Sequence, residues 1–147
     1  MRARNWNAKK TFVNGILFDS KFEADYYMRL LADPDVEKVE VQPVFDVIPA
    51  YTVMYYRCNG SGKQPSLKTE KLINYTLCSG KGEKTKTGAK YTAEFKVYYK
   101  DGRTEIVDVK GGPAPRDFTL RRKLLEKAIG QEGTVIEYNK DKWNRKR

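Results

Sequence analysis

The sequence predicts an α/β fold in which two helices flank one sheet, because helical and strand patterns alternate along its 147 residues. Apolar residues recur at helical spacing over residues 20–32 and over residues 116–129. Alternating apolar and polar residues predict strands at 39–48, 91–99, 104–110 and 134–138. The expected order is helix, three strands, helix, strand, in a single domain spanning 1–147.

The first helix has clear start and stop signals. Ser20 is a good N-cap, and Glu23 follows three residues later, as in a capping box. Asp33-Pro34 ends the helix. The stripe expected to face the sheet contains Phe22, Tyr26, Tyr27, Leu30 and Leu31.

The middle and the end of the chain are less regular. Pro43 predicts an edge or a bulge in the strand at 39–48, and residues 51–58 are a candidate extension of the sheet. Residues 59–90 are rich in Gly, Ser, Thr and Lys, show no evident internal repeat, and read as a basic insertion. The second helix is expected to end at Gly130, with Phe118, Leu124, Leu125, Ala128 and Ile129 buried.

Basic residues dominate the charge: 29 Lys and Arg against 19 Asp and Glu give a net charge of +10. Eight basic and two acidic residues lie between Arg57 and Lys90, and a basic tail occupies about 139–147. A polyanion is the natural partner. The alternative, charge that only aids solubility together with a disordered tail, explains the tail better than the middle segment.

The absence of histidine and the presence of only two cysteines limit which catalytic and metal sites the chain can form. Because the chain has no histidine, a hydrolase would need carboxylates, lysine, tyrosine or a metal ion. Cys58 and Cys78 are too few for a four-ligand zinc site, and two free thiols are expected in a reducing cytosol. With no apolar run near the roughly 20 residues of a membrane span, a cytoplasmic location without membrane contact is expected.

The most informative segment is the hairpin formed by 91–99 and 104–110. Asp108 and Lys110 share one face of their strand. A two-residue turn at Asp101-Gly102 would point Glu94 away from Asp108. A three-residue loop over 100–102 would set Glu94 opposite Asp108. Both turns suit the sequence.

Two facing carboxylates repel unless a cation lies between them, and Mg²⁺ prefers oxygen ligands. Such an ion polarises a phosphate and activates water, while Lys110 orients the water or holds the phosphate. Acid, acid and lysine thus suffice for phosphodiester hydrolysis without histidine. Asp-x-Lys alone is common, and a solvent-facing hairpin with cross-strand charges is the alternative.

Polar residues outside the β-hairpin also have two interpretations each. Glu23 either only caps its helix or completes the metal shell, and Gln42 is a weaker candidate for the same pocket. Basic residues at the start of the second helix either approach DNA phosphates or form a solvated helix face. The residues predicted to contact DNA are Arg121, Arg122, Lys123, Lys90 and Lys96.

Several motifs resemble one known family in their order along the chain. They are Ser20–Tyr27, Val41–Phe45, Tyr91–Phe95, Ile106–Gly111 and the basic helix after Pro115. Together they resemble small phage-encoded endonucleases of the PD-(D/E)xK superfamily, related to Holliday-junction resolvases. The resemblance covers most of the chain from Phe12 to Tyr138.

The resemblance implies a restriction-endonuclease-like core with a central mixed sheet. It assigns Glu23, Glu94 and Asp108 as metal ligands and Lys110 as a catalytic residue, with Mg²⁺ or Mn²⁺ as the cofactor. It also implies branched DNA as substrate, a homodimer, and the host cytoplasm as location. Glu94 departs from the pattern, because aspartate is usual at that position. A non-catalytic DNA-binding protein and an RNA-binding module whose tyrosines stack on bases are the alternatives.

Overall fold

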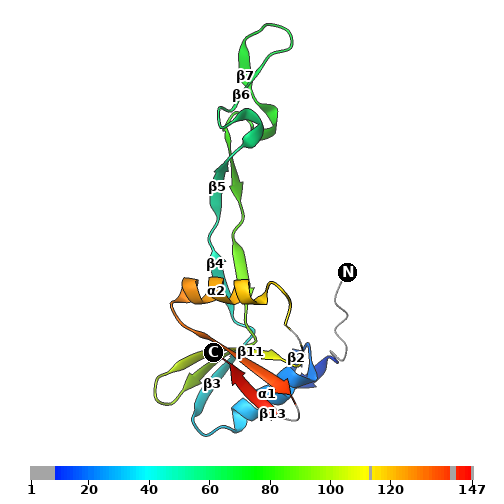
Figure 1. The fold of residues 1–147 in the computed structure, drawn as a ribbon, viewed down its shortest axis with the longest axis vertical. Coiled ribbons are helices and arrows are strands. Elements are labelled where there is room, and N and C mark those ends of the chain that lie inside the picture. Colours follow the sequence, from blue (N-terminus) through cyan, green and yellow to red (C-terminus); the bar gives the residue numbers. More distant parts are fainter. Residues whose placement is uncertain (1–8, 113, 140–141, 147) are drawn as a thin grey trace. The chain divides into compact units, whose positions relative to one another are not determined.

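The computed structural model describes residues 9–112, 114–139 and 142–146, and they fall into two compact units. The first unit lies within residues 1–45 and 91–147, and the second unit spans residues 46–90 (Figure 1). The sequence predicts one domain with an insertion at about 59–90, whereas the second unit already begins at Asp46.

A five-stranded mixed sheet forms the first unit, in the order β13-β12-β11-β10-β3. Between β11 and β12, which are parallel, lies helix α2, and the other pairs are antiparallel. The strands are β3 (Val36–Val41), β10 (Phe95–Tyr99), β11 (Thr104–Lys110), β12 (Gly133–Asn139) and β13 (Lys142–Lys146). The helices are α1 (Lys21–Ala32) and α2 (Phe118–Ile129). The predicted α/β class and mixed sheet are confirmed.

Helix α1 begins where the sequence predicts. The backbone N–H of Glu23 donates to the hydroxyl oxygen of Ser20 at 3.2 Å, so Ser20 caps the helix. Most of the predicted stripe is buried, but Leu31 is 47% exposed, because it lies at the edge of the face that meets the sheet. The α1 side of the sheet forms the main core, with Phe18, Ala24, Tyr26, Tyr27, Leu30, Phe95, Val97, Val107, Val109 and Ile136 buried.

Residues on β11 alternate between the two faces of the sheet. Val107 and Val109 pack toward α1, whereas Ile106 and Asp108 point to the other face, which α2 covers (Figure 1). On α2, Phe118 and Leu125 are buried, but Ala128 is exposed, so the predicted stripe is too wide. Gly130 ends the helix in a left-handed conformation, as predicted (φ 69°).

Two predicted strands are interrupted. The strand expected at 39–48 splits into β3 and β4 (Val44–Ile48), because Gln42 adopts a positive φ of 52° before Pro43. The strand expected at 91–99 splits into β9 (Ala89–Thr92) and β10, with Ala93 and Glu94 between them. Strands β4 and β9 pair with each other in a separate two-stranded sheet.

The sequence reading missed two further elements. A hairpin of β1 (Thr11–Val13) and β2 (Ile16–Phe18) turns at Asn14-Gly15, a favoured sequence for a tight hairpin. The predicted basic tail contains β13, where the Trp143 ring lies 5.2 Å from the ring of Tyr26. In the part of the chain that the structure describes, neither helix is long and apolar enough to cross a membrane.

The second unit consists of short antiparallel pairs. β5 (Tyr51–Met54) pairs with β8 (Glu83–Lys86), and β6 (Lys63–Pro65) pairs with β7 (Leu72–Asn74). Figure 1 shows the chain running out along β5, turning beyond β6 and β7, and returning. The predicted extension of the central sheet over 51–58 is therefore wrong, because β5 pairs within its own unit.

Candidate active site

The register of the β10–β11 hairpin decides where Glu94 lies. Phe95 pairs with Val107 and Lys96 pairs with Ile106, so Glu94 and Asp108 occupy the next position of the same register. The N–H of Tyr99 donates to the carbonyl of Arg103 at 2.9 Å and closes a three-residue loop over 100–102. Of the two turns that the sequence left open, the structure has the one that brings Glu94 to Asp108.

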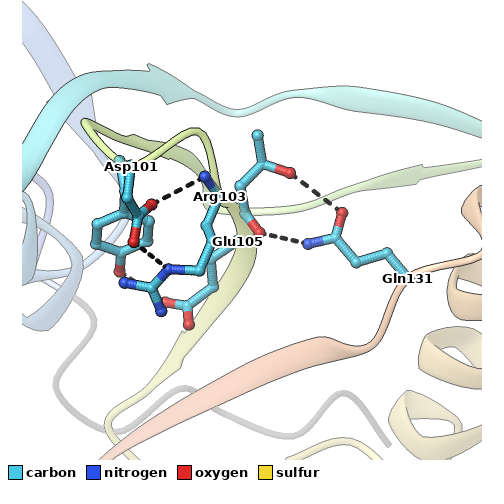
Figure 2. Close-up of polar contacts among 6 residues, drawn as sticks. Asp101, Arg103, Glu105 and Gln131 are labelled. Carbon is cyan, nitrogen blue, oxygen red and sulfur yellow. Dashed lines mark hydrogen bonds and ion pairs between the residues drawn. The ribbon is translucent and has the colours of Figure 1, made fainter.

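Polar contacts hold this turn in place (Figure 2). The Asp101 carboxylate accepts the backbone N–H of Arg103 at 3.0 Å and its Nε–H at 2.6 Å. The Gln131 amide donates to the carbonyl of Thr104 at 2.6 Å and ties β11 to the segment after α2. These contacts accompany the three-residue loop, and the loop length sets the register.

The cluster around Asp108, called the carboxylate cluster below, contains Glu23, Glu94, Asp108 and Lys110. Glu23 and Asp108 are 8% and 5% exposed. Glu94 lies close enough to Glu23, Lys110 and Asp108 for the charge of each of them to shift its pKa. The structure thus brings together all four residues that the sequence assigned to the centre of the site.

Burial and neighbouring acidic side chains dominate the electrostatics of the carboxylate cluster. Burial, the neighbouring Glu23 carboxylate and Asp108 raise the pKa of Glu94 to about 8, although Lys110 opposes this shift. Burial also raises the pKa of Asp108, against the hydrogen bond from Tyr91 and the positive charge of Lys110. One ammonium group does not offset three clustered acids, and an added cation would relieve their repulsion.

Tyr91 and Arg121 also interact with Asp108. The hydroxyl of Tyr91 donates to Asp108 Oδ2, and burial together with the Asp108 charge raises the pKa of Tyr91. The guanidinium of Arg121 lies 5.3 Å from the centre of the Tyr91 ring and favours the ionised form of Asp108. Lys110 Nζ lies 4.7 Å from the centre of the Phe118 ring.

Comparison with known proteins places the chain in a family. Residues 3–140 match the family model described as "Protein of unknown function (DUF1064)". The chain belongs to the DUF1064 family. No curated protein and no solved structure matches it. The family description names no activity.

The residues of the DUF1064 chain that were predicted to contact DNA have different neighbours in the structure. Arg121 lies beside the carboxylate cluster, as described above. Arg122 is partly buried and its Nε lies 3.2 Å from Glu126 Oε1 on the same helix, whereas Lys123 is exposed. A phosphate that approached the cluster would therefore meet Arg121 more readily than Arg122.

The remaining predicted residues have contacts of their own. Lys96 Nζ lies 5.1 Å from the centre of the Tyr98 ring on β10. Lys90 belongs to the second unit, where it forms an exposed ion pair with Asp46 at 3.8 Å. Gln42 is exposed, and its backbone N–H donates to the carbonyl of Glu94 at 2.8 Å. Gln42 thus supports the backbone of Glu94.

The donor types of the cluster fit a hard divalent cation, because carboxylate oxygens are the ligands that Mg²⁺ and Mn²⁺ favour. In the present arrangement, no three His, Cys, Asp or Glu side chains of the described residues converge tightly enough to enclose an ion. Glu23 accepts from the Ser20 hydroxyl at 3.0 Å, and Asp108 accepts from Tyr91. Each of these carboxylates therefore has one oxygen engaged in a hydrogen bond.

Sequence reasoning missed Tyr91 because it treated 91–99 as one continuous strand. In such a strand, Tyr91 would share a face with Phe95 and point away from Glu94 and Asp108. The break at Ala93 and Glu94 reverses this alternation, so Tyr91 and Glu94 both reach Asp108. No signal in the sequence marks this break as clearly as Pro43 marks the break between β3 and β4.

Proposed function

We propose that the DUF1064 chain is a metal-dependent DNA endonuclease of the PD-(D/E)xK type. The observation that carries this proposal is the register of the β10–β11 hairpin, which sets Glu94 beside Asp108. Glu23 and Lys110 interact electrostatically with Glu94 and complete the acid, acid and lysine set that hydrolysis without histidine requires.

Each residue of the cluster has a distinct role in this proposal. Glu94 and Asp108 would hold the ion, and Glu23 would support them directly or through water. Bound Mg²⁺ or Mn²⁺ supplies polarisation of the scissile phosphate and a more acidic water. Lys110 orients the attacking water or holds the phosphate. Tyr91 positions the Asp108 carboxylate, and Arg121 receives an adjacent phosphate.

DNA is the partner that the charge favours. The net charge of +10 and the basic run between Arg57 and Lys90 suit a polyanion, and phosphate contacts dominate such binding. The resemblance to resolvase-related endonucleases adds branched DNA as the substrate class and a homodimer as the working form.

A cleavage assay tests the proposal. The purified chain is incubated with a four-way junction and with linear duplex, each with Mg²⁺ and with a chelator. The Asp108→Asn variant should lose cleavage while its DNA affinity stays near that of the unchanged protein. Glu37→Gln, which removes an exposed carboxylate on β3, is the matched control and should cut normally.

Two outcomes would overturn the proposal. Cleavage that persists in Asp108→Asn would show that Asp108 is not a metal ligand. Binding of DNA without cleavage under any divalent cation would leave a non-catalytic DNA-binding protein on the same scaffold.

A further inference from the structure

The second unit contains an internal repeat that the sequence reading missed. Residues 55–62 and 75–82 both have the pattern Tyr-x-x-Cys-x-Gly-x-Gly. We call these two segments the knuckles. The pattern is a weak sequence signal, because only four positions recur and three of them are glycine or tyrosine, which are common in this chain.

The two knuckles have the same backbone conformation. Each contains a short 3-10 turn that ends at its cysteine, Tyr56–Cys58 in one and Thr76–Cys78 in the other. The residue after each cysteine, Asn59 or Ser79, has a φ of 51°, and the glycine that follows has a φ of 76° in both. Equal conformations at equivalent positions indicate a structural repeat.

The knuckles also bind each other symmetrically. The N–H of Tyr55 donates to the carbonyl of Gly82 at 2.9 Å, and the N–H of Tyr75 donates to the carbonyl of Gly62 at 2.8 Å. A Cβ at Gly62 would lie 2.3 Å from the Gly80 carbonyl oxygen, and one at Gly82 would lie 2.2 Å from that of Gly60. Only glycine permits this close approach, so the repeated glycines hold the cysteines face to face.

The two sulfur atoms meet between the knuckles. Cys58 and Cys78 are 9% and 8% exposed, and their Sγ atoms lie 3.9 Å apart. This separation is far longer than a disulfide bond of about 2.05 Å. It matches the span of about 3.8 Å between two sulfurs bound to one tetrahedral zinc ion through bonds of about 2.3 Å.

Backbone groups contact both sulfurs: Cys58 Sγ lies 3.5 Å from the carbonyl oxygen of Tyr55, and Cys78 Sγ lies 3.7 Å from that of Tyr75. The N–H of Gly82 donates to Cys78 Sγ at 3.4 Å. Thiolates are the form of cysteine that binds metal ions.

We propose that Cys58 and Cys78 together bind one soft metal ion, of which zinc is the best match, between the two knuckles. Two thiolates leave two of the four zinc positions to water or another donor. A Cys-x-x-Cys knuckle would supply these donors three residues after each cysteine, where this chain has Ser61 and Lys81. The site is separate in composition from the carboxylate cluster and does not depend on the proposed nuclease activity.

Titration of the full chain with Cd²⁺ tests this site directly. After purification with a reducing agent and a chelator, the protein should develop an ultraviolet sulfur-to-cadmium charge-transfer band that saturates at one ion per chain. Cys58→Ser and Cys78→Ser should each abolish the band, and zinc should compete it away. Asp108→Asn is the control and should retain the band, which separates this site from the carboxylate cluster.

Three results would overturn the proposal: no band, a band that survives loss of either cysteine, or saturation at one ion per two chains. Formation of a disulfide under the same reducing conditions, in place of metal binding, would also overturn it.

A gain of affinity provides a second test. The double variant Ser61→Cys, Lys81→Cys adds a thiol at the second position of each knuckle. If the knuckles have metal-site geometry, zinc affinity should rise by at least about 100-fold, which corresponds to tenfold for each added thiolate. The matched control Ser66→Cys, Lys68→Cys adds two thiols near the tip of the same unit and should leave the affinity unchanged. Equal affinities for the two double variants would contradict the proposed geometry.

Discussion

Glu94 differs from an ordinary surface acid in its protonation state at neutral pH. With a pKa raised to about 8 by burial, Glu23 and Asp108, it carries a proton at neutral pH in the metal-free protein. Without a cation this carboxylate is protonated, and a bound cation would favour its ionised form. Such a group is a suitable ligand for a metal ion that arrives with the substrate. Proton release on metal binding is the expected consequence.

The raised pKa of Glu94 predicts how stability changes with pH. Between the ordinary pKa of 4.5 and the folded value of about 8, the folded state binds more protons at Glu94 than the unfolded state. The free energy of unfolding should therefore fall as pH rises through this window. Thermal unfolding with a chelator should show this fall, and Glu94→Gln should reduce it. An identical pH dependence in the variant would contradict the assigned pKa.

Tyr91 shows how one hydroxyl can position a carboxylate. Its O–H donates to Asp108 Oδ2 within the buried cluster, as partners of metal ligands commonly do. Tyr91→Phe should lower metal-dependent cleavage by about 10–100-fold and raise the Mg²⁺ concentration needed for half-maximal cleavage. Tyr98→Phe, whose hydroxyl contacts the exposed Glu40 at 3.1 Å, is the control. Equal losses in both variants would show a general effect on folding.

At the scale of elements, the loop over 100–102 connects sequence to site. Gly102 has a φ of 89°, which lets the three-residue loop close, and the loop sets Glu94 beside Asp108. Both candidate turns contain Asp101-Gly102, so the sequence alone did not choose between them. The contacts of Asp101 with Arg103, and of Gln131 with Thr104, favour the observed turn. Gln131 lies 27 positions from Thr104, and local sequence patterns do not predict such a contact.

Substitution of Gly102 tests how much its backbone conformation contributes to the free energy of unfolding. Gly102→Ala should lower the free energy of unfolding by about 1 kcal/mol, because alanine is strained at a positive φ even though no atom lies within 4 Å of its Cβ. Gly112→Ala is the matched control, with equally open space and no positive φ. Denaturant unfolding of both variants gives the comparison. Equal stabilities would show that the conformation of Gly102 does not stabilise the register.

The elements that the sequence predicted well are those with strong local signals. Ser20 and Gly130 delimit α1 and α2 as expected, and β11 has its predicted bounds. The missed β13 lacks such a signal, because its residues are mostly basic and Trp143 packs on Tyr26 from far along the chain. Its pairing with β12 depends on tertiary contacts that a local pattern does not encode.

For the whole molecule, the composition predicted a basic insertion but not the structure of that segment. The glycine-rich repeat, rather than an apolar core, organises the second unit, so hydrophobic periodicity gave no indication of its start at Asp46. Many of its apolar side chains are exposed, among them Met54, Tyr56 and Leu77. Exposed aromatic and basic side chains together are typical of surfaces that bind nucleic acid.

The basic residues of the second unit should contribute to DNA affinity through phosphate contacts. The double variant Lys84→Gln, Lys86→Gln removes two exposed charges from this unit. If each contacts a phosphate, the slope of log affinity against log salt concentration should become shallower by about 0.9 per lost contact. Lys38→Gln, Lys100→Gln is the matched control, since these exposed lysines lie toward the turn end of the β10–β11 hairpin, away from Glu94 and Asp108. Fluorescence anisotropy with labelled duplex at several salt concentrations measures both slopes. The same change in both variants would mean that DNA responds only to net charge, and an unchanged slope in the first would exclude phosphate contacts at Lys84 and Lys86.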